Sequence, residues 1–141
     1  MQGLIMTDVK SQYLARLEQD IESLFDYDPD RRVFMGMFGQ HLGALYLTVD
    51  DFSEIFEHKV EAFFMLFYAM LQRGHLKLQK DGQILEKSPK EWISIFTESF
   101  PKTDMPYGAY QGDIILWFSD DHCPAYAVWV DPIDGSLQWA S

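Results

Sequence analysis

In the first half of the chain, apolar residues recur at intervals of three and four, the spacing that places them on one face of an α-helix. The first such stretch predicts a helix that ends near Asp26, with apolar positions Leu14, Leu17, Ile21, Leu24 and Phe25. A similar rhythm continues over residues 33–45, but glycines at 36, 39 and 43 interrupt it. Because each glycine costs about 1 kcal/mol in a helix relative to alanine, residues 31–47 fit either a closely packed helix or a bent, irregular segment.

The strongest helical pattern runs from about Asp50 to Arg73. Apolar residues form one continuous face over this range: Phe52, Ile55, Phe56, Val60, Phe63, Phe64, Phe67 and Leu71. The later half is apolar nearly all round, which is typical of a helix covered on several sides, and Gly74 supplies a left-handed cap at its end. The longest apolar run, residues 62–71, rises only about 15 Å, half of what a bilayer core requires, so we expect a buried helix.

After Gly74 the pattern changes to alternation, which is typical of a half-buried strand. Leu76 and Leu78 face one way, while the polar residues between and beside them face the other. Asp81-Gly82 then predicts a tight hairpin turn, and Ile84 begins the return strand.

A further helix is predicted to begin at Ser88-Pro89-Lys90-Glu91. Serine is a favoured N-cap, proline is favoured at the first helical position, and a glutamate three residues after the serine can complete a capping box. Pro101 ends this helix. Its inward face is formed by Trp92, Ile93, Phe96 and Phe100.

The C-terminal part of the chain predicts β-structure. Ile114–Phe118 and Tyr126–Val130 are short apolar runs of strand-like length, and a turn over Asp131–Gly135 leads into a last strand over Ser136–Trp139. The order of elements predicts an α+β fold, in which a helical N-terminal half with a long buried central helix packs on an antiparallel sheet of hairpins from the C-terminal half. At 141 residues, we expect a single domain, 1–141.

Charge narrows the classes of function. The 22 acidic residues against 11 Lys and Arg give a formal charge of -11 and an isoelectric point near 4.5. Nucleic acids and anionic membranes bind basic surfaces, so we expect neither as a partner. The single cysteine, Cys123, excludes an intramolecular disulfide, and the first residues lack a secretory signal. Both features favour a cytoplasmic protein.

Few residues are spaced for catalysis or metal binding. The histidines, at 41, 58, 75 and 122, lie in different predicted elements and form no i, i+4 pair. One cluster, Asp120-Asp121-His122-Cys123, is open to two interpretations: a nucleophile or metal site, or a small buried thiol ahead of Pro124. From this pattern we expect a protein that is not an enzyme and that holds neither a metal nor another cofactor.

The charge is distributed unevenly along the chain. Residues 1–61 carry a net charge of -7 and residues 62–102 a net charge of +2, whereas residues 103–141 carry six acids and no Lys or Arg. An aromatic-rich stretch without a basic residue is a candidate face for a basic partner, although an acidic surface also keeps a small protein soluble.

Short motifs along the second half resemble those of a small, mostly bacterial family, the domain-of-unknown-function family five-nine-six. The resemblance covers about residues 50–141, and its motifs are caps, turns and packed tryptophans. The matching segments are Leu71–Leu78, Asp81-Gly82, Leu85, Ser88, Glu91, Phe100–Lys102, Trp117-Phe118, Cys123–Ala125, Val128-Trp129 and Asp134–Trp139.

This resemblance implies an immunity protein, because proteins of this kind tend to be encoded in the toxin–immunity clusters of interbacterial competition. Such a protein would neutralise a basic, nuclease-type toxin by pairing carboxylates with its Lys and Arg, which requires no catalysis. Two alternatives stay open: a housekeeping or regulatory domain that binds a protein or small molecule, and an enzyme that uses His122 and Cys123. The residues expected to contact the basic partner are Asp104, Tyr107, Tyr110, Asp113, Asp120 and Asp121.

Overall fold

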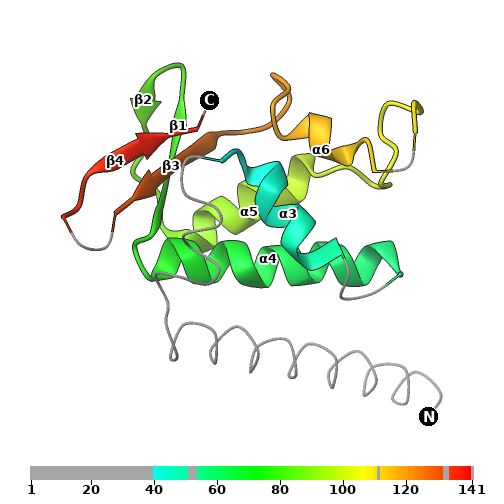
Figure 1. The fold of residues 1–141 in the computed structure, drawn as a ribbon, viewed down its shortest axis with the longest axis horizontal. Helices are drawn as coiled ribbons and strands as arrows, with labels where there is room; N and C mark the ends of the chain where they lie inside the picture. The colour runs from blue at the N-terminus through cyan, green and yellow to red at the C-terminus, as the bar shows by residue number, and fades with distance from the viewer. Residues whose placement is uncertain (1–39, 51–53, 111, 132–133, 141) are drawn as a thin grey trace, which may run out of the picture.

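The computed structural model describes residues 40–50, 54–110, 112–131 and 134–140, and the helix predicted before Asp26 lies outside them. Helices come first and the sheet is completed at the C-terminal end, which confirms the predicted α+β fold (Figure 1). The elements are α3 (Leu42–Val49), α4 (Phe56–Gln72), β1 (Leu76–Lys80), β2 (Gln83–Ile84), α5 (Pro89–Ser99), α6 (Ile114–Trp117), β3 (Tyr126–Val130) and β4 (Leu137–Trp139).

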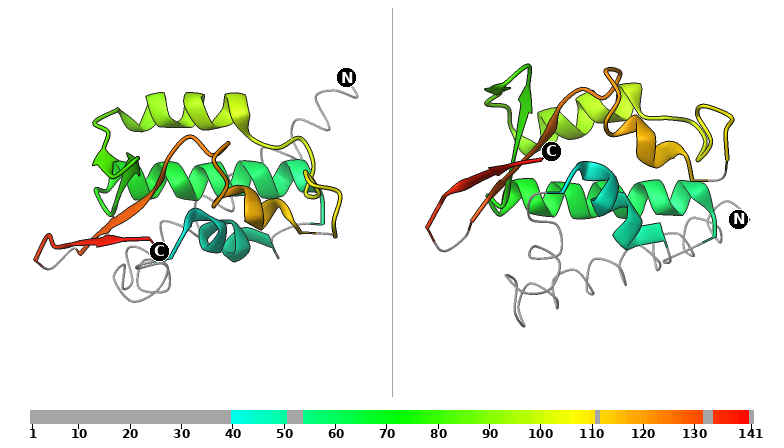
Figure 2. Two further views of the ribbon diagram at one scale, coloured as in Figure 1. Left: turned by 90° about the horizontal axis from the view of Figure 1, so that it is seen from above. Right: turned by 45° about the horizontal axis from the view of Figure 1, so that its top comes forward.

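Helix α4 is the centre of the helical layer. Figure 2 shows α3 and α5 on opposite sides of it, and both pack against it. The short helix α6 packs against α3, and strand β1 follows directly from the C-terminal end of α4. Within the described part of the chain, no helix has the length and apolar content that crossing a bilayer requires.

The sheet has the order β2-β1-β3-β4, and every neighbouring pair is antiparallel. Asp81 and Gly82 connect β1 to β2 with φ angles of 55° and 81°, the left-handed geometry that a two-residue hairpin turn needs. The predicted hairpin is confirmed. Strand β3 pairs with both β1 and β4, and its fully buried Trp129 donates an indole N–H to the backbone carbonyl of Gln40, 2.7 Å away.

The core is built around aromatic rings from the helices. The ring of Phe63 on α4 is fully buried and stacks on Phe67 and Phe100, with centroid separations of 5.4 and 5.7 Å. Phe118, which follows α6, lies 5.3 Å from the same ring, and Tyr46 of α3 lies 6.1 Å from it. One ring of α4 therefore joins α3, α6 and the end of α5 into one core.

The start of the central helix differs from the prediction. Helix α4 begins at Phe56, not at Asp50, because Asp50 is the C-cap of α3 and Ile55 has an extended backbone. Asp50 and Glu54 therefore lie between the two helices. Lys59 on α4 bridges that junction through an ion pair of 3.0 Å with Asp50.

The segment Ile114–Phe118 was predicted as a strand, and that prediction is wrong: Ile114–Trp117 forms helix α6. A short apolar run has no periodicity that separates a strand from a helix. In the structure, Ile114 and Trp117 are buried three residues apart, whereas Leu116 is 50% exposed. This is the pattern of one covered face of a helical turn.

Residues 42–49, for which the sequence left two conformations open, form the regular helix α3. Its N-cap is His41, whose Nδ1 accepts a hydrogen bond of 3.0 Å from the backbone N–H of Gly43. A Cβ at position 43 would lie 3.0 Å from Cγ2 of Ile115 and closer still to the His41 ring. The glycine is therefore present for close packing of α3 against α6, despite its cost in helix propensity.

Candidate functional site

The segment that connects α5 to β3 is folded back on itself around α6. The hydroxyl of Tyr107 donates a 2.5 Å hydrogen bond to Oδ2 of Asp120, which joins the two ends of the segment. Burial, and then this hydrogen bond, raise the pKa of Tyr107 to about 12. The same bond, as its largest cause, holds the pKa of the Asp120 carboxyl below its usual range, so the carboxylate is ionised at neutral pH.

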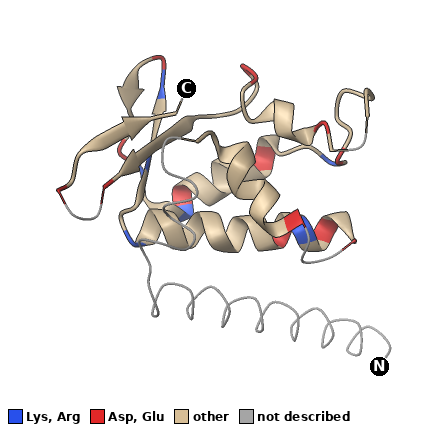
Figure 3. Cartoon of the chain, in the orientation of Figure 1, with Lys and Arg blue, Asp and Glu red and all other residues tan. Residues whose placement is uncertain are grey.

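Large side chains are exposed along this segment. Four of them are 41% to 58% exposed, and one of these, Tyr107, is bonded to Asp120, whose carboxylate accepts from the backbone N–H of Asp121. Figure 3 shows acidic but no basic residues along the described chain from residue 103 onward, as the sequence requires. We call this surface the acidic aromatic face, and define it as Met105, Tyr107, Tyr110, Leu116, Asp120 and Asp121.

Lys80 of strand β1 fixes the C-terminal end of this face. Its Nζ donates to the backbone carbonyls of Asp121 and Cys123, at 3.2 and 3.0 Å. It also lies 3.2 Å from the hydroxyl of Tyr126, which in turn donates to the carbonyl of Asp120 at 2.8 Å. Lys80 thus holds the backbone at Asp121, and neither Asp120 nor Asp121 forms a Lys or Arg ion pair within the described ranges.

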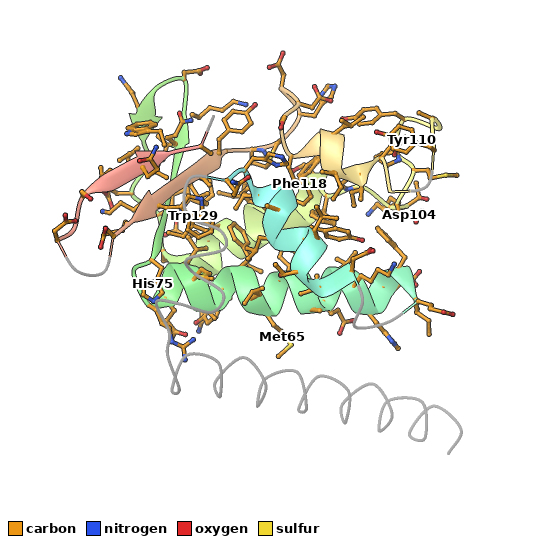
Figure 4. The ribbon with its side chains drawn as sticks, viewed as in Figure 1. Met65, His75, Asp104, Tyr110, Phe118 and Trp129 are labelled. Carbon is orange, nitrogen blue, oxygen red and sulfur yellow. The ribbon has the colours of Figure 1, made fainter. Side chains whose placement is uncertain are left out.

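Two of the predicted contact residues do not lie on this face. Asp113 is fully buried, and its Oδ2 accepts a 3.0 Å hydrogen bond from the backbone N–H of Ala109, so it organises the segment and is not available to a partner. Asp104 is half-buried and lines a pocket next to the face. Figure 4 shows Asp104 and Tyr110 at the same end of the molecule. Tyr107, Tyr110, Asp120 and Asp121 lie where a partner can reach them, and their role in binding stays a prediction.

The pocket beside Asp104 has a volume of about 230 Å³. Its wall contains the ion pair between Asp50 and Lys59, and Tyr46, which is 2% exposed. The sequence analysis did not single out these three residues as site residues, because they come from α3, its C-cap and α4, and no local pattern joins them. The complete lining is Tyr46, Asp50, Lys59, Asp104, Gly112 and Ile114.

The cluster around Cys123 lacks the properties of an activated nucleophile. The thiol is fully buried and donates to the backbone carbonyl of Ala125, with an S···O distance of 3.3 Å. Burial raises the pKa of Cys123 to about 12, so the thiol stays protonated at neutral pH, whereas His122 is exposed. No three His, Cys, Asp or Glu residues of the described ranges are grouped in a way that could hold a metal ion.

Comparison with known proteins identifies the family. Residues 71–140 match the family described as "Protein of unknown function, DUF596". A solved structure of an uncharacterised protein conserved in bacteria, from Neisseria meningitidis, is 42% identical, covers 99% of this chain and 98% of its own, and superposes with a TM-score of 0.71. No match occurs among curated proteins. The chain therefore belongs to the DUF596 family, which confirms the resemblance seen in its caps, turns and tryptophans.

Proposed function

We propose that this protein acts in the cytoplasm as an immunity protein, and that it binds and neutralises a basic, nuclease-type toxin through the acidic aromatic face. The observation that carries this proposal is the combination of exposed rings with carboxylates over residues 103–125, which contain no Lys or Arg. Aromatic side chains are the usual anchors of protein interfaces, and carboxylates steer a basic partner toward them.

The geometry of the face favours tight binding. The bonds from Tyr107 to Asp120, and from Lys80 to the backbone of Asp121, order the face before a partner arrives. Ordering in advance lowers the entropy cost of association. An interface of standard size would cover about 800 Å² of this protein, enough to occlude a substrate channel without making or breaking a bond.

The direct test is co-expression with the basic product of the adjacent gene, followed by titration calorimetry. We expect a complex whose affinity falls between low salt and about 0.5 M NaCl, because exposed charges are screened over that range. Tyr110→Ala should weaken the complex about tenfold or more, as the loss of an interface anchor does. The matched control is Glu98→Gln, which removes an exposed charge from α5 and should leave the affinity unchanged.

The absence of a complex at low salt would contradict the proposal. Equal binding by the wild-type protein and Tyr110→Ala would also count against it, because the face would then not be the contact surface. Either result favours the alternative that the sequence left open, a housekeeping or regulatory domain whose acidic residues serve solubility.

A further inference from the structure

The hydroxyl group of Tyr46 is one of two buried side-chain polar atoms without a hydrogen-bond partner in the described part of the chain; the other is Oδ1 of Asp113. The ring of Tyr46 packs in the core, 6.1 Å from the rings of Phe63 and Phe118, and the residue is 2% exposed. The hydroxyl is buried and has no hydrogen-bond partner among the described residues. A buried hydroxyl without a partner is unfavourable, so a residue that keeps one calls for a reason.

Tyr46 lines the pocket of about 230 Å³, and two carboxyl residues, Asp50 and Asp104, line it as well. Burial first, then the charges of Asp50 and Asp104, raise the pKa of Tyr46 well above its ordinary value, so the phenol stays neutral and can both accept and donate a hydrogen bond. Asp50 is paired with Lys59, whereas Asp104 has no ion pair within the described ranges. The pocket wall thus contains two carboxyl side chains and one lysine, a formal charge of -1.

We propose that this pocket is a binding site for a primary alkylammonium group, supplied by a lysine side chain of the basic partner. The ammonium carries three donors and one charge, which the Asp104 carboxylate and the Tyr46 oxygen can satisfy together. The pocket lies beside the acidic aromatic face and shares the segment that carries it, since the N–H of Ile114 donates to the carbonyl of Asp104.

That a lysine of the partner supplies the ammonium rests on the proposed function. That the pocket binds an ammonium group does not, so this part is tested first with a small probe. Addition of n-butylammonium to the full-length protein should shift the backbone NMR signals of Tyr46, Gly112 and Ile114, and equal concentrations of n-butanol should not. Asp104→Asn and Tyr46→Phe should each weaken this binding about tenfold, the loss that follows removal of a charge-assisted hydrogen bond. Tyr46→Phe keeps the ring and removes only the unpaired hydroxyl, so the fold is retained.

The matched control is Asp121→Asn, which removes a carboxylate from the acidic aromatic face and not from the pocket. It should bind n-butylammonium as the wild-type protein does. The inference is overturned if n-butylammonium leaves the pocket signals unchanged, or if Asp104→Asn binds it with unchanged affinity. If the basic partner binds in spite of either result, the proposed function stands without this inference.

The affinity of Asp104→Asn for the basic partner then identifies the source of the ammonium group. If Asp104→Asn weakens both n-butylammonium and the partner, the lysine assignment is supported. If it weakens n-butylammonium alone, the lysine assignment is overturned and the pocket serves a small free amine. If n-butylammonium binds while no basic protein does, the proposed function has failed, the lysine assignment has failed with it, and the ammonium site remains.

Discussion

Ser88 and Glu91 form a reciprocal pair at the start of α5. The hydroxyl of Ser88 accepts from the backbone N–H of Glu91 at 3.1 Å, and the Glu91 carboxylate accepts from the backbone N–H of Ser88 at 3.0 Å. The hydrogen bond from the Ser88 backbone, as the largest cause, lowers the pKa of Glu91 below its ordinary value of 4.5. The ionised carboxylate is therefore favoured by the folded state over the unfolded one.

This pair predicts a pH dependence of stability. Because the folded pKa of Glu91 is depressed, its contribution is present above the ordinary pKa of 4.5 and is lost as the pH falls through the lower, folded value. The free energy of urea unfolding, measured at neutral pH and at about pH 3, should fall less for Glu91→Gln than for the wild-type protein. Glu98→Gln, at the other end of the same helix, is the control. Its free energy of unfolding should fall with pH by as much as that of the wild-type protein.

The thiol of Cys123 gives a second prediction at this scale. Because it is fully buried and its pKa is raised to about 12, a thiol reagent such as dithionitrobenzoate should not label the native protein at pH 8. In urea the one cysteine of the chain should be labelled completely. Rapid labelling of the native protein would show that the thiol is accessible and would reopen the hypothesis of a nucleophile.

Among single residues, local capping roles could be predicted from the sequence, whereas burial could not. The roles of Ser88 and Glu91 were predicted because a capping box is encoded within four residues. Asp113 was predicted on the surface because its charge is a surface signal, yet its carboxylate is buried and bound to the Ala109 backbone. Burial is set by the fold of the surrounding segment, and no local pattern reports it.

At the scale of elements, α4 contributes most to the core, and Phe63 is its central ring. Phe63→Ala should lower the free energy of unfolding by about 3–5 kcal/mol, because it removes a fully buried ring and leaves a cavity between three elements. Urea denaturation measures the loss. Phe64→Ala is the matched control. Phe64 is a half-buried neighbour on the same helix, so its substitution should lower the free energy of unfolding clearly less. Equal losses would contradict the assignment of Phe63 as the centre of the core.

Elements with strong local signals were predicted well, and the others were not. The hairpin at Asp81-Gly82 and the helix from Pro89 carry their own turn and cap residues. Helix α6 has only four residues, too few for periodicity to separate helix from strand. The break before α4 was missed because the acids around Asp50 suit a helix start, whereas in the structure Asp50 ends α3 and pairs with Lys59.

At the scale of the whole molecule, the acidic aromatic face could be predicted from the sequence, whereas the pocket could not. The acidic aromatic face comes from one continuous segment, so charge counting along the chain located it. The pocket joins Tyr46, Lys59 and Asp104, which are 13 and 45 positions apart along the chain and meet only when α3, α4 and the segment after α5 pack together. A site of this kind requires the tertiary structure.

The net charge of -11 predicts opposite salt effects on stability and on binding. Self-repulsion of a strongly acidic chain destabilises the compact state, so moderate NaCl should raise the melting temperature, while the same salt should weaken the proposed complex. Thermal denaturation and calorimetry at matched salt concentrations measure the two effects. A melting temperature that falls with NaCl would show that attractive ion pairs outweigh the repulsion.

The bond between Trp129 and Gln40 has a consequence for biosynthesis. It spans 89 positions, and Trp129 lies in the strand that separates β1 from β4, so the sheet lacks this strand until residues 126–130 have been made. Until β3 has been made, the helices that precede it lack this strand as a packing partner, and part of their apolar surface stays uncovered. The fold thus cannot be completed before Tyr126–Val130 has been synthesised, and a nascent chain arrested before Tyr126 should remain sensitive to protease.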